Sequence, residues 1–282
     1  MTGSSEADRD IGALAKGGRT NVGGFALRLI ARLPFLFIAG RIYGPDLVGR
    51  FALAVVIVEL AALIATLGLK RGLAQALSTT DRPHVDVVFD ALAVALGAGL
   101  AMSAFLFAFP ELMYADNTAS WIERLLPLTV VALAWSDVML AALAYRHNVA
   151  ATVTARAVVE PWTISIAAWV FSYVSIRHGL ILSYMLSIAA ALTASAIPFL
   201  KSYGWPTRWR LQPMRIAALA RANVPIAGAD ALEWGTRNVD RFILGLMFEP
   251  KVVGIYYMAQ QVASLPQKLK TSFDPILGPV VT

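Results

Sequence analysis

Residues 179–200 read GLILSYMLSIAAALTASAIPFL, an apolar run that contains no charged residue. A helix needs about 20 mainly apolar residues to cross the hydrocarbon layer of a bilayer, and this run is long enough. A helix also satisfies its backbone hydrogen bonds locally, as lipid requires. The run therefore predicts a transmembrane helix, and similar runs recur along the chain between short charged segments.

The composition of the whole chain agrees with that prediction. Hydrophobic residues make up 58% of the chain, charged residues 15%, and the mean hydropathy is +0.64, whereas soluble domains are about 45–50% apolar and about 25% charged. We predict an all-α integral membrane protein with about eight transmembrane helices. The predicted spans are Val22–Tyr43, Leu47–Leu69, Val85–Phe109, Leu125–Tyr145, Ala157–Ile176, Gly179–Leu200, Val224–Phe248 and Val252–Ile276.

The basic residues indicate how the chain is oriented in the membrane. Lys and Arg are retained in cytoplasmic loops more than in exported ones. If the N-terminus lies in the cytoplasm, basic residues on the cytoplasmic side outnumber those on the opposite side by roughly three to one. We therefore expect a multi-pass protein whose N-terminus is cytoplasmic. This distribution also explains the pI of about 9.7 without a nucleic-acid partner.

Two short segments of the chain resemble each other. Residues 37–49 read FIAGRIYGPDLVG, and residues 242–254, 205 positions later, read FILGLMFEPKVVG. Six of the thirteen aligned pairs are identical. The simple alternative is that loops between apolar helices generally favour Pro and Gly. If the repeat is real, each unit holds six helices, and this even number makes the two units parallel about an axis along the membrane normal.

The repeat divides the chain into three predicted parts. Residues 1–20 are polar, of mixed charge, and lack the apolar core of a signal peptide, so we expect a disordered cytoplasmic tail. Residues 21–203 are expected to form an N-terminal six-helix bundle. Residues 204–282 would supply a cytoplasmic loop and the first two helices of an incomplete second bundle. We therefore expect a truncated chain, or one that relies on another polypeptide for the missing helices.

Residues in and near both copies of the repeat resemble a known family. Residues 44–52, GPDLVGRFA, followed by residues 67–69, LGL, are similar to the first two helices of Wzx-type polysaccharide transporters. Residues 238–245, NVDRFILG, and residues 253–256, VGIY, resemble that family's seventh and eighth helices. These flippases belong to the MATE-like multidrug/oligosaccharidyl-lipid/polysaccharide exporter superfamily. Its members usually have twelve to fourteen spans, more than are predicted for this chain.

The resemblance implies a function for the chain. Such proteins flip an undecaprenyl-pyrophosphate-linked oligosaccharide from the inner to the outer leaflet of the bacterial inner membrane, for lipopolysaccharide or other polysaccharide biosynthesis. The implied partners are the lipid bilayer, the lipid-linked oligosaccharide and the polymerase and glycosyltransferases of polysaccharide assembly. The implied mechanism is alternating access between two facing bundles.

Four arginines lie within the predicted spans. Arg28 and Arg32 are four residues apart in the first span, and Arg237 and Arg241 have the same spacing in the seventh. Arg32 and Arg237 are equivalent in the repeat. A buried arginine normally faces a wet cavity or a partner, and a guanidinium suits bidentate binding of phosphate. We therefore hypothesise that these arginines line a cavity and hold the anionic head group.

The alternative is that the arginines pair with acids inside the protein. Candidate acids are Glu233, Asp240, Glu59 and Asp137. Glu59 and Asp137 could instead couple transport to protons or sodium ions, as carboxylates at membrane depth often do. Lys268 and Lys270 could extend the basic cavity or reach the interface by snorkelling.

Other polar residues give no indication of catalysis. Arg156 and Glu160, four residues apart, are typical of an ion pair at the start of a helix, here the fifth span. The histidines His84, His147 and His178 fall in predicted loops without ligand-spaced companions, so no metal site is predicted. The sequence contains no Walker-type phosphate loop and no recognisable Ser/His/Asp order. We expect no enzyme activity, no metal and no cofactor.

Three other functions stay open. A cation-coupled multidrug exporter of the same superfamily would have a cavity dominated by acids and aromatic residues. A non-transporting membrane scaffold would fit a chain that lacks most of its second bundle. A membrane glycosyltransferase or polymerase would need a large polar extracytoplasmic loop with catalytic acids or bases, and the sequence has none.

Overall fold

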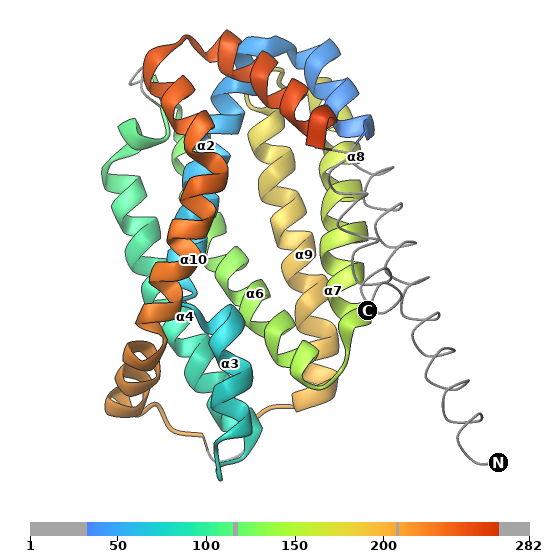
Figure 1. Cartoon of the computed structure of the whole chain (residues 1–282). Coiled ribbons are helices and arrows are strands. Elements are labelled where there is room, and N and C mark those ends of the chain that lie inside the picture. Colours follow the sequence, from blue (N-terminus) through green and yellow to red (C-terminus); the bar gives the residue numbers. More distant parts are fainter. Residues whose placement is uncertain (1–32, 115–117, 207–208, 265–282) are drawn as a thin grey trace, which may run out of the picture.

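A computed structural model describes residues 33–114, 118–206 and 209–264 (Figure 1). These residues form helices joined by short connections, and no β-strand occurs among them. Four helical stretches are long and apolar enough to cross a membrane: Leu33–Ser78, His84–Ala108, Trp121–Tyr145 and Gly179–Tyr203. The chain is therefore an all-α multi-pass membrane protein, as the sequence predicts. The number of spans stays a prediction.

The helices follow the apolar runs closely in the middle of the chain. α4 covers His84–Ala108 and α9 covers Gly179–Tyr203, against predicted spans of Val85–Phe109 and Gly179–Leu200. The other described elements are η1 (Ala39–Tyr43), α2 (Gly44–Ala65), α3 (Leu69–Ser78), η2 (Pro110–Leu112), α5 (Trp121–Arg124), η3 (Leu126–Leu128), α6 (Thr129–Tyr145), α7 (Val149–Val153), η4 (Thr154–Val159), α8 (Glu160–Ser172), α10 (Pro213–Met247) and a helix at residues 250–264. α3 and the α9–α10 connection lie at one end of the bundle (Figure 1).

A tight turn at Gly44 and Pro45 starts α2. Gly44 has a φ of 81°, a backbone conformation that favours glycine. Pro45 stands in the first turn of the helix, where a missing N–H costs nothing. α2 ends before Leu67 and Gly68, whose φ values are positive, at 46° and 75° respectively. The predicted second span, Leu47–Leu69, is therefore interrupted, and its last residue starts α3.

The predicted fifth span, Ala157–Ile176, starts too late. The helix begins at Val149, where the Asn148 side chain accepts a hydrogen bond from a backbone N–H of the first turn (3.4 Å), and it continues through η4 into α8. Arg156 therefore lies inside this helix and not before its start. In the sequence, Arg156 and Glu160 indicate the start of a span. In the structure they form an ion pair within a helix that has already begun.

α10 also starts earlier than predicted, at Pro213 instead of Val224. It contains 35 residues, which at 1.5 Å per residue corresponds to about 52 Å. The hydrocarbon core of a bilayer is only about 30 Å thick. The first turns of α10 carry the exposed residues Arg215 and Arg221, so the extra length is basic and suited to the membrane surface.

α6 lies at the centre of the bundle and packs against α2, α3, α4 and α9. Ser136 of α6 and Ser195 of α9 are both buried and share a hydrogen bond of 2.8 Å. The Tyr203 hydroxyl donates to the carbonyl oxygen of Ala142 (2.8 Å). Small residues and hydroxyl groups are common at helix contacts in membranes. α10 packs against α2, α3 and α4, so the second predicted unit contacts the first.

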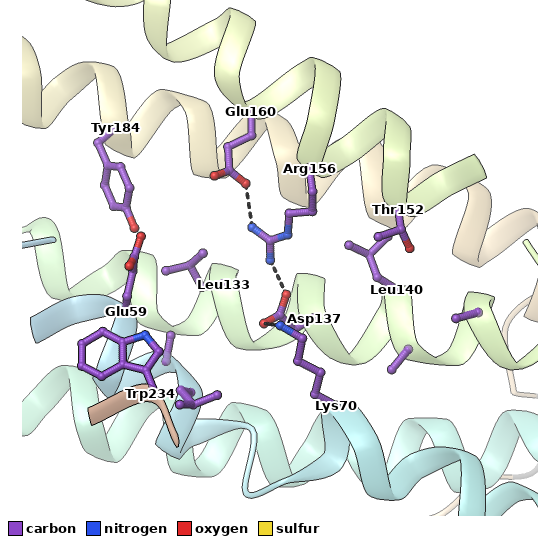
Figure 2. A pocket seen from close by; sticks show the side chains of 14 residues that line it. Glu59, Lys70, Leu133, Asp137, Leu140, Thr152, Arg156, Glu160, Tyr184 and Trp234 are labelled. Carbon is purple, nitrogen blue, oxygen red and sulfur yellow. Dashed lines mark hydrogen bonds and ion pairs between the residues drawn. The ribbon is translucent and has the colours of Figure 1, made fainter. Parts of the chain in front are cut away.

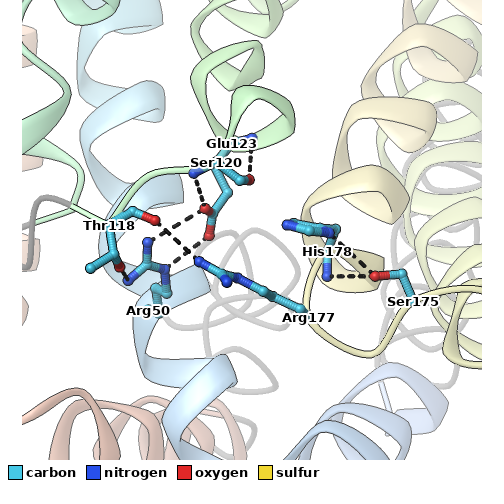
Figure 3. A network of polar contacts seen from close by, with 7 residues as sticks. All are labelled: Arg50, Thr118, Ser120, Glu123, Ser175, Arg177 and His178. Atoms are coloured by element: carbon cyan, nitrogen blue, oxygen red, sulfur yellow. Dashed lines mark hydrogen bonds and ion pairs between the residues drawn. The ribbon is translucent and has the colours of Figure 1, made fainter.

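An ion pair fixes the start of α2 to the connection between α4 and α6 (Figure 3). Arg50 Nε lies 2.9 Å from Glu123 Oε1, and Arg50 Nη2 lies 3.4 Å from Glu123 Oε2. Arg50 Nη1 also donates to the Thr118 hydroxyl (3.2 Å), and its guanidinium lies over the Tyr114 ring (4.7 Å). Glu123 is 1% exposed and closes a capping box with Ser120. Breaking a buried pair of this kind is unfavourable.

Replacing Glu123 with Ala is expected to destabilise the protein, because the largely buried Arg50 guanidinium would lose its carboxylate partner. The expected loss in the free energy of unfolding is about 3 kcal/mol, measured by thermal unfolding of the detergent-purified full chain. Glu111→Ala is the matched control, since Glu111 is exposed in the same connection. Equal unfolding temperatures for the two variants would contradict a structural role for the pair.

Candidate functional site

A cavity of about 560 Å³ lies between α2, α3, α6, α9, α10 and the helix formed by α7, η4 and α8 (Figure 2). Its apolar lining residues are Ala62, Leu63, Leu133, Leu140, Ala141 and Ala144. Its polar and aromatic lining residues are Glu59, Lys70, Asp137, Thr152, Arg156, Glu160, Tyr184 and Trp234. The cavity therefore combines an apolar wall with a concentrated set of charges.

Four of these residues form a chain of alternating charge across the cavity (Figure 2). Lys70 Nζ lies 3.4 Å from Asp137 Oδ2, and Arg156 Nη2 lies 2.5 Å from Asp137 Oδ1. Arg156 Nη1 lies 2.8 Å from Glu160 Oε2. The Arg156 side chain is only 18% exposed. Alternation compensates each charge in surroundings where an unpaired charge would be unfavourable.

Sequence reasoning identified only part of this arrangement. It placed Glu59 and Asp137 at membrane depth, and both line the cavity. Their ion-coupling role stays a prediction. Lys70 and Arg156, which the sequence did not indicate as site residues, also line the cavity. Sequence reasoning read Arg156 and Glu160 as an ion pair without a function. Their i,i+4 spacing, with alanine and valine between and before them, was the available indication that the helix begins earlier.

The other end of the cavity is aromatic. Figure 2 shows the side chains of Glu59 from α2 and Tyr184 from α9 pointing toward each other. Trp234 of α10 lines the same cavity. Because α10 belongs to the second predicted unit, Trp234 adds one residue of that unit to a cavity that is otherwise lined by helices of the first.

The two arginines of α10 have partners close to them. Arg237 Nη2 lies 2.8 Å from Glu233 Oε1, and the Arg237 side chain is 74% exposed. Arg241 Nε donates to Gln260 Oε1 (2.7 Å). Neither arginine lines the cavity, although Trp234, one turn before Arg237, does. The role of both arginines as cavity cations stays a prediction.

The remaining predicted cavity cations, Arg28, Arg32, Lys268 and Lys270, lie outside the described residues. No group of three or more His, Asp or Glu residues that could hold a metal ion occurs in the part of the chain that the structure describes. The expectations of no metal, no cofactor and no catalytic residue stay predictions.

A comparison with known families places this site in context. A family model described as "Polysaccharide biosynthesis protein" matches residues 38–282. No curated protein and no solved structure matches the chain. The matched range includes every helix that lines the cavity.

The row of alternating charges predicts that the stability effects of replacing Asp137 and Arg156 are strongly coupled. Arg156→Gln would leave the Asp137 carboxylate with one cation fewer, and Asp137→Asn would leave Arg156 without its closest acid. Each single variant is expected to lose about 3 kcal/mol of stability, and the double variant less than the sum. Unfolding of the detergent-purified full chain measures all four proteins. Strictly additive losses would mean that the two side chains act independently, contrary to this prediction.

Proposed function

Because the chain belongs to the polysaccharide biosynthesis protein family, we propose that it moves a lipid-linked oligosaccharide across the bacterial inner membrane. The observation that carries the proposal is the cavity between the helices, in which Arg156 and Lys70 supply positive charge within an apolar wall. The proposed passenger consists of an undecaprenyl chain, a pyrophosphate and a short glycan. An apolar membrane excludes the charged pyrophosphate most strongly, so this group has the greatest need of protein partners.

Arg156 is suited to hold the pyrophosphate. Its planar guanidinium can donate two parallel hydrogen bonds to phosphate oxygens. In the structure its donors are used by Asp137 and Glu160, and phosphate oxygens would replace one of these carboxylates when the passenger enters. Lys70, whose side chain is 54% exposed, offers a second cation on a flexible stem. The cavity volume of about 560 Å³ suits a head group more than a whole lipid.

In this proposal the protein acts as a carrier and not as an enzyme. A cavity lined from both units suits alternating access, in which the units rock to expose one site to each side of the membrane. The end with α3 and the α9–α10 connection would face the cytoplasm, because basic residues concentrate there. Glycosyltransferases would then build the passenger on that face, and a polysaccharide polymerase would use it on the other.

A second candidate is a cation-coupled exporter. The observation in its favour is that three acids and two aromatic residues line the same cavity: Glu59, Asp137, Glu160, Tyr184 and Trp234. In that case the acids would bind protons or sodium ions in turn, whereas in the leading proposal Asp137 and Glu160 hold the arginine between passengers. The two candidates differ in whether the guanidinium is needed for transport.

The test uses a bacterial strain whose polysaccharide export depends on this protein. The double variant Asp137→Asn/Arg156→Gln removes the guanidinium without leaving Asp137 charged. Export is expected to fall roughly tenfold or more, since a hydrogen bond to a charged group contributes about 2 kcal/mol. Lys201→Gln is the matched control and should retain export, because it removes an exposed cation at the end of α9.

Two results would contradict the leading proposal. The first is normal export by a double variant that reaches the membrane at the level of the unchanged protein. The second is that the double variant loses resistance to cationic drugs while polysaccharide export is unaltered. This result would favour the cation-coupled exporter.

A further inference from the structure

The two copies of the sequence repeat touch each other at one end of the protein. A Cβ atom added to Gly49 would overlap the carbonyl oxygen of Pro250 and lie 2.8 Å from Gly254 N. A Cβ atom added to Gly254 would overlap the carbonyl oxygen of Pro45 and lie 2.8 Å from Gly49 N. Pro45 and Pro250 are equivalent in the repeat, and so are the two glycines. Each copy therefore makes the same contact on the other.

A second pair of contacts follows the same relation. A Cβ atom on Gly40 would lie 2.9 Å from Met258 Sδ, and a Cβ atom on Gly245 would lie 3.2 Å from Leu53 Cδ1. Gly40 corresponds to Gly245 in the repeat, and Leu53 corresponds to Met258. The first copy thus contacts the second through the same pair of positions by which the second contacts the first. A contact of this reciprocal kind has two-fold symmetry. The two helix pairs are thus related by a local pseudo-two-fold axis.

The centre of this contact is apolar and closely packed. Val48 and its equivalent Val253 are 0% and 1% exposed, and Gly49 and Gly254 beside them are buried. Glycine lets helix backbones approach closely, as at many helix contacts in membranes. The contact therefore leaves little room for water or for a polar head group.

Hydrogen bonds and an ion pair hold each side of the contact to its own unit. Arg50, next to Gly49, is tied to Glu123 in the first unit (Figure 3). In the second unit, the Asp240 carboxylate of α10 accepts hydrogen bonds from Tyr256 and from Gln260 (2.7 Å). Beside this contact the hydrogen bonds and ion pairs thus lie within the units, while the glycine contact itself depends on van der Waals packing. The units are joined by ion pairs elsewhere, where Arg71 of α3 lies 3.2 Å from Asp230 and 2.8 Å from Glu233 of α10.

From this arrangement we infer that the reciprocal contact of residues 45–49 with residues 250–254 is a gate that parts during each transport cycle. The inference rests on the proposed carrier function. Separating packed backbones breaks many weak contacts and leaves no charge unpaired, so the two units can part along this line without unfolding. The gate lies at the end of the bundle opposite α3 and the α9–α10 connection (Figure 1), so it would close the extracytoplasmic side.

The test exploits the absence of cysteine from the chain. Leu53→Cys/Gly245→Cys places one cysteine on each side of the gate; a Cβ atom on Gly245 would lie 3.4 Å from Leu53 Cγ, within reach of a disulfide. Ser136→Cys/Ser195→Cys is the matched control, because these hydroxyls lie 2.8 Å apart within the first unit. Purified full-length protein is placed in liposomes with undecaprenyl-pyrophosphate-linked oligosaccharide, and lectin binding reports the glycan that reaches the outer leaflet.

Oxidation of the gate pair is expected to lower movement of the glycan at least about tenfold, as for a path held closed by a covalent bond, and reduction should restore it. The disulfide of the control pair should leave movement unchanged. Failure of the gate pair to cross-link, or undiminished movement after complete cross-linking, would overturn the gate and leave the carrier intact. If the cysteine-free protein moves no glycan, the carrier proposal falls, and the gate falls with it.

Discussion

The pairing of Arg156 with Asp137 is the interaction on which the rest of the structure depends. A guanidinium inside a helix bundle persists only when an acid compensates it, so η4 must stay beside α6. This requirement allows the helix that contains α8 to begin at Val149, well before the charged residues that resemble its boundary. Arg156 also lies in a π-helical segment, a local irregularity that often occurs at functional sites.

The same pair connects the fold with the proposed transport. A guanidinium that is held by two carboxylates can exchange one of them for a phosphate, and Asp137 would then keep Lys70 as its cationic partner at 3.4 Å. The cavity therefore holds polar interactions that a passenger can replace, while the contact around Gly49 and Gly254 is apolar and can only be closed or open. In this account, binding and closure belong to different places with different chemistry, which is what alternating exposure of one site requires.

The sequence predicted the features that depend on local apolar length. The bounds of α4 and α9 follow their runs, which are mainly apolar over their whole length, although α4 carries Asp86 and Asp90 in its first two turns. The starts of α10 and of the continuous helix that contains α8 could not be predicted in the same way. A charged residue within a helix and one in a loop look alike in the sequence until the partner is known. The partner of Arg156 is 19 residues away on another helix. The spacing of 205 residues did predict which segments are equivalent, but only the fold brings Gly49 against Gly254.

Equilibrium binding to the detergent-purified full chain tests most directly whether the cavity recognises an anionic head group. The measurement compares undecaprenyl pyrophosphate with uncharged undecaprenol, which share the same hydrocarbon chain. The account predicts that the pyrophosphate binds roughly tenfold tighter or more, and that Asp137→Asn/Arg156→Gln removes the difference, since the advantage comes from charge-assisted hydrogen bonds of about 2 kcal/mol. Equal affinity for the two lipids in the unchanged protein would contradict it.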